Sequence, residues 1–296
     1  MLSFTFFALS ALMVLAYGLQ GALQAKYIRK YDALTVGVYR NISLSVTMLP
    51  ILFLVPAADI LRISEHLGTL FLASTIGALG LWCSFSSAHY LPIGFGTALR
   101  QVAHTVTAVA LGALFFSELL SPSQLLLLAL IMFSGISLIL ARVDHDHLDP
   151  RLVMRGVGLA LLAGVIVAHS FYFLSLLSRE VDPLVAAYFW EAGVGIVLLF
   201  LFIARQYRYP KRVAEKVNFY DARTIIAISL LTIVGTVSYA SAATHGPYAL
   251  VSGLMSMTTL VSVLMGWYLY SERVSRLQGI LISFSIACVI LLKLLS

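Results

Sequence analysis

The chain has 296 residues, of which 60% are apolar and only 11% are charged. Soluble domains carry roughly a quarter charged residues, so this composition excludes a water-soluble domain and predicts a membrane protein. The net charge of +6 does not indicate a nucleic-acid partner, because 17 of the 19 lysines and arginines lie in short connectors between apolar segments or at the span ends that adjoin them. There we expect them to set the topology and to contact lipid headgroups.

About ten apolar segments follow one another along the chain, each of the roughly 20 residues that a helix needs to cross a bilayer. They lack the alternating pattern of a barrel strand, and a spanning segment must satisfy its backbone internally, so we predict α-helices. The predicted spans are 4–24, 33–55, 67–89, 94–116, 123–141, 155–177, 183–204, 224–243, 248–270 and 277–295. The fold class is therefore an all-α integral membrane protein with ten transmembrane helices.

The first span could be mistaken for a secretory signal peptide. It lacks a basic leading region and an A-x-A site, and further spans follow it without interruption. We therefore expect it to be retained as the first helix, in a multi-pass protein that lies in the cell (inner) membrane if the source is bacterial.

A polar connector at 142–154 divides the chain into residues 1–141 and 155–296, and the two parts share a motif. FFSELLSPSQ at 115–124 and LYSERVSRLQ at 269–278 keep Ser, Glu, Ser and Gln at a shift of 154 residues. Asp32 and Asp182 also correspond, at a shift of 150. Because five spans are an odd number, a duplicated half enters the membrane upside down, so we predict two inverted five-helix repeats.

The two five-span parts each hold a Ser-Glu turn between their fourth and fifth spans, and Arg40 lies in the second span. In these features the chain resembles the drug/metabolite transporter superfamily, specifically its EamA-type ten-helix carriers. The resemblance covers essentially the whole chain. It implies a central pathway between the halves and the export or uptake of small metabolites such as amino acids. Its motifs are specific for the fold and do not identify the substrate.

The basic residues of the connectors are distributed unevenly. The connectors after the first, third, fifth, seventh and ninth spans, counted with the span ends that adjoin them, hold 14 of them, whereas the other connectors, the termini and their adjoining span ends hold three. Basic loops stay in the cytoplasm, so the charge distribution predicts that both termini lie outside. The family resemblance implies both termini inside, and the sequence leaves the orientation open.

Three formally charged residues lie within the spans and away from their ends, namely Arg40, Arg100 and Glu191. A charge at mid-membrane costs at least about 2.5 kcal/mol, so each should face a partner, a cavity or a substrate. As binding groups, the arginines would hold a carboxylate or phosphate, and Glu191 would carry a proton or bind an amine. Alternatively, Glu191 pairs with an arginine as a structural ion pair, and Arg40, about seven residues into its span, reaches the interface.

Polar stripes follow two spans that correspond in the two repeats. The fourth span carries Thr97, Arg100, Gln101, His104 and Thr107 at spacings typical of one helical face, and the ninth carries Tyr248, Ser252, Ser256, Thr259 and Ser262. We expect both stripes to line one pathway, with Ser256 and Thr259 among the binding residues. In the alternative, the Ser and Thr hydroxyls bond to their own helix and serve packing.

Smaller polar groups complete the candidate site. His169 and Tyr172 lie one turn apart in the sixth span, and Tyr17, Gln20 and Gln24 do the same in the first. A histidine changes charge near neutral pH, so His104 or His169 could couple proton movement to transport. A histidine that is simply hydrogen-bonded inside the bundle is the commoner case.

Other chemistry-bearing residues receive structural interpretations. The 144–149 segment, DHDHLD, has metal-ligand composition but lies in an exposed connector, where polar residues need no further explanation. Glu118 and Glu272 precede the fifth and tenth spans, and we expect them to cap those helices and complement their dipoles. Cys83 and Cys288 fall in apolar segments and predict buried free thiols, with no metal site.

No nucleotide-binding or hydrolase motif is found, so we expect no cofactor and no enzymatic activity. The sequence predicts a secondary active transporter of a small polar, amino-acid-like or carboxylate-like metabolite that works by alternating access, with H+ as a candidate coupling ion. The first, fourth, sixth and ninth spans should line the site, with contributions from the second and seventh. The alternatives are a flippase for a lipid-linked phosphate carrier and a non-transporting membrane scaffold. The sequence predicts no oligomeric state.

Overall fold

The computed structural model describes residues 3–91, 93–140, 150–208, 217–270 and 276–294, and these residues form helices and turns with no strand among them. In chain order the α-helices are α1 (Phe4–Lys30), α2 (Ala33–Thr47), α3 (Ala57–Leu61), α4 (Leu67–Ser87), α5 (Ile93–Phe115), α6 (Pro122–Leu140), α7 (Pro150–Glu180), α8 (Pro183–Arg208), α9 (Phe219–His245), α10 (Tyr248–Leu254), α11 (Thr258–Tyr270) and α12 (Arg276–Leu294). Three 3-10 segments join them, η1 (Leu49–Leu54), η2 (Arg62–His66) and η3 (Met255–Met257).

Local sequence explains where several helices begin. The side chains of Ser3, Asp32 and Asn218 each accept a hydrogen bond from a backbone N–H in the first turn of α1, α2 and α9. Such caps satisfy amide groups that a helix start leaves unpaired. Proline opens α6, α7 and α8, at the one helical position where its missing N–H costs nothing.

Seven helical segments among the described residues are long and apolar enough to cross a membrane. They are Phe4–Lys30, Ala33–Leu54, Ala57–Ser87, Phe95–Phe115, Pro150–Glu180, Pro183–Arg208 and Phe219–His245. Three shorter apolar helices, Pro122–Ser137, Tyr248–Ser262 and Gly279–Leu294, complete the set. Each of the ten predicted spans therefore falls on helical segments. Helices α1, α7, α8 and α9 extend further than predicted because charged ends such as that of α1 continue helically past the apolar stretch.

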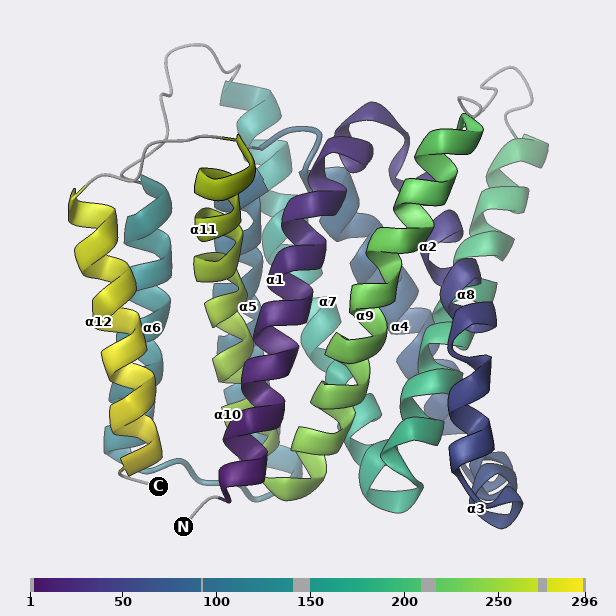
Figure 1. The fold of residues 1–296 in the computed structure, drawn as a ribbon, viewed down its shortest axis with the longest axis horizontal. Helices are drawn as coiled ribbons and strands as arrows, with labels where there is room; N and C mark the ends of the chain where they lie inside the picture. The colour runs from purple at the N-terminus through teal and green to yellow at the C-terminus, as the bar shows by residue number, and fades with distance from the viewer. Residues whose placement is uncertain (1–2, 92, 141–149, 209–216, 271–275, 295–296) are drawn as a thin grey trace.

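The long helices stand side by side along a common direction, and both ends of the chain lie at the same end of the bundle (Figure 1). We call this the terminal end, and the other the basic end, because the helix ends there carry most of the described lysines and arginines. The α3 turn, which the sequence did not predict, lies at the terminal end. At one edge α12 packs on α6, while α4 packs along α7 and α1 along α9 in the body of the bundle.

Close packing between α5 and α7 depends on a glycine. A methyl group at Gly164 would collide with the carbonyl oxygen of Arg100 and lie 2.7 Å from the Cβ atom of Ala103. Membrane helices have little hydrophobic drive to associate and instead gain packing where small residues let backbones approach. Gly164 therefore brings the polar face of α5 against α7, which sets the position of Arg100 relative to the other repeat.

The predicted continuous span 248–270 is interrupted. Residues Met255–Met257 form the 3-10 segment η3 between α10 and α11, and the hydroxyl of Ser256 donates to the Gly253 carbonyl at 2.7 Å. A short 3-10 stretch within a helix often marks a hinge or a functional site. This break gives the ninth span a discontinuous helix of the kind that forms substrate sites in secondary transporters.

Candidate binding cavity

A cavity of about 150 Å³ lies between the two halves of the chain. Helices α1, α2, α4 and α5 line it from the first half, and α7, α8, η3 and α11 line it from the second. Its polar lining is formed by Tyr17, Gln20, Gln24, Arg40, Ser84, Ser87, Thr97, Arg100, Gln101, His104, Ser170, Glu191, Thr258 and Ser262. Bulky apolar side chains cover the rest of the wall, including Phe85, Phe171, Trp190 and Met255.

The cavity extends from the middle of the bundle toward the basic end. Its lining includes Ile28 near the end of α1, Ser87 in the last turn of α4 and Gly96 in the first turn of α5, and all three helix ends lie at the basic end. The deepest lining residues on α1 and α5, Tyr17 and His104, lie halfway along their helices. The cavity therefore runs toward the basic end in the observed state.

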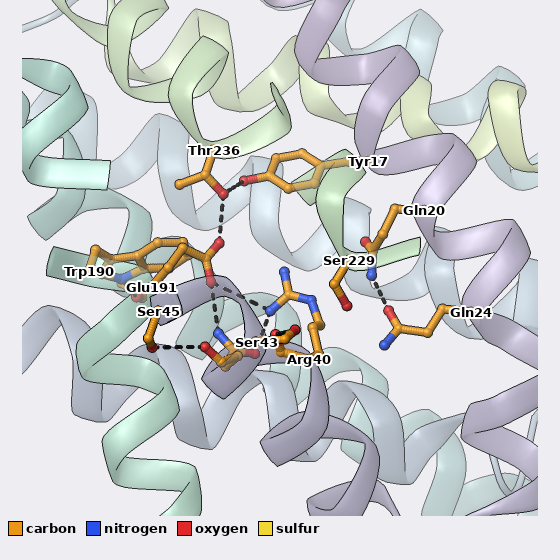
Figure 2. Close-up of polar contacts among 12 residues, drawn as sticks. Tyr17, Gln20, Gln24, Arg40, Ser43, Ser45, Trp190, Glu191, Ser229 and Thr236 are labelled. Atoms are coloured by element: carbon orange, nitrogen blue, oxygen red, sulfur yellow. Dashed lines mark hydrogen bonds and ion pairs between the residues drawn. The ribbon is translucent and has the colours of Figure 1, made fainter. Parts of the chain in front are cut away.

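A buried network surrounds Glu191 on α8. Its Oε2 atom accepts a hydrogen bond from Asn41 at 2.7 Å and lies 3.6 Å from an Arg40 guanidinium nitrogen. Its Oε1 atom accepts from the Thr236 hydroxyl at 2.6 Å, and Tyr17 contacts that hydroxyl at 2.8 Å (Figure 2). With every partner in place Glu191 is only 1% exposed, so its charge is held by neighbours on α2 and α9.

Arg40 does not reach the interface. It is 6% exposed and donates to the Asn41 side-chain oxygen at 2.6 Å, while its Nε has no hydrogen-bond partner among the described residues. The predicted alternative, in which Glu191 pairs with an arginine, matches this geometry. The partner is the arginine of the second span.

Arg100 differs from Arg40 because no carboxylate in the described chain pairs with it. Its guanidinium donates to the Ser84 hydroxyl of α4, and the like charge of Arg40 acts on it across the cavity. Next to it on α5, the Gln101 amide donates to the Thr258 hydroxyl of α11 at 2.9 Å and so ties the two halves together. The cavity therefore contains one cation without a counter-ion in the structure described.

Two further polar side chains line the cavity with unused hydrogen-bonding atoms. His104 is 1% exposed, and neither ring nitrogen has a partner in the described parts of the chain. The Gln24 amide nitrogen on α1 is likewise unpartnered, although its oxygen accepts from Gln20. Buried polar groups are normally satisfied, so atoms left unused around a cavity are candidates to contact a ligand.

An aromatic layer closes the cavity toward the terminal end. The Phe171 ring contacts those of Tyr17, Trp190 and Tyr239, with its centroid 4.3 Å from that of Tyr239. The Tyr239 hydroxyl in turn lies 3.2 Å from Ser175 and 3.0 Å from Ser252. Tyr239 is fully buried, so this layer separates the cavity from the terminal end.

Below this layer, Glu118 and Arg179 form an ion pair at the terminal end, with 2.7 Å between their charged atoms. Arg179 also donates to the Ala243 carbonyl, and Glu118 accepts from the Ala249 amide at the start of α10.

The prediction that Glu118 caps the following helix is therefore wrong. Helix α6 is instead capped by Ser121, whose amide and hydroxyl exchange hydrogen bonds with Gln124, and Glu118 contacts α10 of the other half. Its predicted counterpart Glu272 lies outside the described residues.

The structure brings six of the ten predicted binding residues to the cavity wall. These are Gln20, Arg40, Arg100, Gln101, His104 and Glu191. The other four lie elsewhere: His169 bonds to the Val165 carbonyl of its own helix, Tyr172 packs between Phe116 and Tyr248, Ser256 bonds within its turn, and Thr259 is buried away from the cavity. The break in the ninth span turns Met255, Thr258 and Ser262 toward the cavity instead.

Sequence reasoning missed the partners that hold the charged groups. It did not single out Ser84, Asn41 or Thr236, and it left α4 out of the cavity wall altogether. A signal existed for Asn41, because it precedes Glu191 by 150 residues, the same shift that relates Asp32 to Asp182. The segment 144–149, which has metal-ligand composition and received a structural interpretation from the sequence, lies outside the described residues.

Comparison with known proteins agrees with this architecture. A model of the EamA-like transporter family matches residues 5–141 and again residues 154–294. The chain belongs to the EamA-like transporter family. This EamA-like chain is thus a multi-pass integral membrane protein built from two EamA repeats, in a transporter family that is normally non-enzymatic and that fits the drug/metabolite transporter superfamily.

The fold of this EamA-like chain also occurs among solved structures, of which 28 chains match it. One crystal structure superposes with a TM-score of 0.76 over 97% of each chain at 13% sequence identity, a level that shows the fold alone. Among curated proteins, the comparison found no match.

Proposed function

We propose that this EamA-like chain is a secondary active transporter that moves a small polar, carboxylate-bearing metabolite across the membrane by alternating access. The observation that carries the proposal is the cavity between the repeats, which runs toward the basic end, is closed toward the terminal end and contains Arg100 with no carboxylate partner among the described residues. A partly buried cation without a counter-ion is costly in a membrane unless a ligand neutralises it.

The proposed architecture is ten spanning helices in two inverted five-helix repeats. Seven long and three shorter apolar helices supply the ten spans. The Asn41–Glu191 hydrogen bond joins residues 150 positions apart at the α2–α8 contact, as expected where equivalent helices of inverted repeats meet at their pseudo-twofold axis. Rocking of the halves about this contact would alternate access to the cavity.

In this mechanism the charged residues have two roles, substrate binding and the pairing of two helices. Arg100 neutralises the substrate carboxylate, while Arg40 and Glu191 pair with each other and hold α2 against α8. Proton coupling is a finer part of the proposal, with His104 as the better placed carrier because its ring lines the cavity with both nitrogens free to bond.

Transport by reconstituted protein tests the proposal. Arg100→Gln should abolish counterflow of a carboxylate solute in proteoliposomes while the variant still inserts and purifies as a folded protein. The matched control is Arg223→Gln, the same substitution at an exposed arginine that does not line the cavity. Equal rates for the wild type and Arg100→Gln would overturn the assignment. Transport or competition restricted to polyprenyl phosphates would favour a flippase instead.

A further inference from the structure

We propose that the cavity selects small monocarboxylates with apolar bodies and rejects the zwitterionic α-amino acids of the same skeleton. The inference rests on the proposed transport function and narrows its substrate class. It follows from the charges around the cavity, from the hydrogen-bonding atoms left unused and from the apolar wall.

The charges in the membrane interior favour an anion. Two guanidinium groups, Arg40 and Arg100, face one carboxylate, Glu191, which leaves one positive charge uncompensated. Arg40 is the arginine that Glu191 balances, so the excess lies on Arg100. A ligand with one net negative charge neutralises the site, whereas a zwitterion brings no net charge.

The ammonium group of an amino acid finds no carboxylate with which to pair. Glu191 is the one acidic residue lining the cavity, but both of its oxygens already accept hydrogen bonds, from Asn41 and from Thr236, and it is 1% exposed. An ammonium group would have to displace one of these donors or remain unpaired. A buried charge without a partner loses more in desolvation than it gains.

The unused donors around Arg100 suit a carboxylate. His104 lies one turn from Arg100 on α5 and offers an unpartnered ring N–H in either neutral tautomer. The Gln24 amide on α1 offers another unpartnered donor on the cavity wall. A carboxylate provides two oxygens with about four acceptor positions, so it can engage a guanidinium and additional donors together.

The rest of the wall suits a short apolar body. The apolar side chains that line the cavity include Ile28, Leu81, Phe85, Val167, Phe171 and Met255. A cavity of about 150 Å³ is large enough to hold a ligand of about the size of benzene. Small monocarboxylates therefore fit, whereas nucleotides and other large polyanions do not.

The test uses matched ligands that share a carbon skeleton. Thermal stabilisation of the purified wild-type protein is measured with propanoate, 4-methylpentanoate and 3-phenylpropanoate, each against its 2-amino analogue, namely alanine, leucine and phenylalanine, and against its neutral amide. A ligand that binds the folded state raises its apparent stability by mass action. We expect at least one carboxylate to stabilise the protein and to bind about tenfold or more tightly than its amino acid and its amide.

Variants assign the effect to the cavity. Arg100→Gln should remove the stabilisation by the carboxylate, His104→Phe should weaken it, and Arg223→Gln should leave it unchanged. The inference is overturned if an amino acid binds as tightly as its carboxylate, if no carboxylate stabilises the protein, or if Arg100→Gln retains the effect.

Parallel flux measurements separate this inference from the proposed function. Transport of amino acids in proteoliposomes, with no preference for carboxylates, would preserve the transporter and remove the monocarboxylate assignment. Carboxylate binding that depends on Arg100 without any flux would preserve the binding site and remove the transporter.

Discussion

Glu191 is held by three groups from two neighbouring helices, and each contact constrains the others. Asn41 donates to Glu191 with its amide nitrogen and accepts from Arg40 with its amide oxygen, so it bridges the acid and the base. Thr236 donates a hydrogen bond from its hydroxyl to the other carboxylate oxygen. Because both oxygens of the carboxylate accept hydrogen bonds, the network fixes the rotation of α2 against α8.

Removing the charge of Glu191 should weaken the folded protein. Glu191→Gln replaces charge-assisted hydrogen bonds and leaves Arg40 without a counter-ion, which should cost roughly 1.5–3 kcal/mol. Thermal unfolding of the detergent-solubilised variant measures the loss. The double variant Arg40→Gln/Glu191→Gln removes both charges and should recover part of it, because the coupling of paired residues is typically about 0.5–3 kcal/mol. Additive losses in the double variant would show that the two charges are not coupled.

At the scale of elements, the ion pair between Glu118 and Arg179 joins four helix ends at the terminal end. Glu118 follows α5 and contacts the first turn of α10, while Arg179 in the last turn of α7 contacts the carbonyl of Ala243 near the end of α9. The pair lies below the Tyr239 layer that closes the cavity. In an alternating-access cycle these contacts must break before the terminal end can open.

Weakening this ion pair should open the terminal end more often. In a background with Cys83→Ser and Cys288→Ser, a cysteine introduced by Ser252→Cys next to Tyr239 reports opening by its rate of reaction with a small maleimide. Glu118→Gln should raise that rate several-fold. The same substitution at the exposed Glu65 is the matched control and should leave it unchanged. An unchanged rate in Glu118→Gln would show that the ion pair does not hold the closed state.

The positions of the helices could be predicted from the sequence, because apolar length alone fixes where a chain crosses a membrane. The break at Met255–Met257 could not, since its residues are as apolar as those of a continuous helix. The partners of the charged residues were also missed. Whether Arg100 meets Ser84 or a carboxylate depends on which helices pack together and how each is rotated, and neither follows from the pattern along one span.

At the scale of the molecule, the cavity runs toward the end that holds most of the basic residues. Among the described residues, nine lysines and arginines lie at the basic end and three at the terminal end. If the basic end faces the cytoplasm, as the charge distribution predicts, the cavity faces inward in the observed state. The opposite orientation, which the family resemblance implies, makes it face outward.

Cysteine labelling in intact cells decides between these orientations. In the same cysteine-free background, Ser123→Cys lies exposed at the terminal end and Tyr220→Cys, at a position 74% exposed, lies at the basic end. The charge distribution predicts that a membrane-impermeant maleimide labels Ser123→Cys in intact cells, and Tyr220→Cys only after permeabilisation. The reverse pattern would place both termini inside.

The contact between Asn41 and Glu191 also bears on whether two identical five-helix chains could form the same bundle as a dimer. In a dimer of identical chains, a residue next to the twofold axis meets its own copy, so a carboxylate there would face a carboxylate and an amide would face an amide. In the proposed inverted repeat, an amide paired with a carboxylate across the pseudo-twofold axis requires two halves that differ in sequence. Joining the halves in one polypeptide permits that difference. The buried carboxylate of Glu191 can then meet a neutral amide instead of a second carboxylate that would repel it.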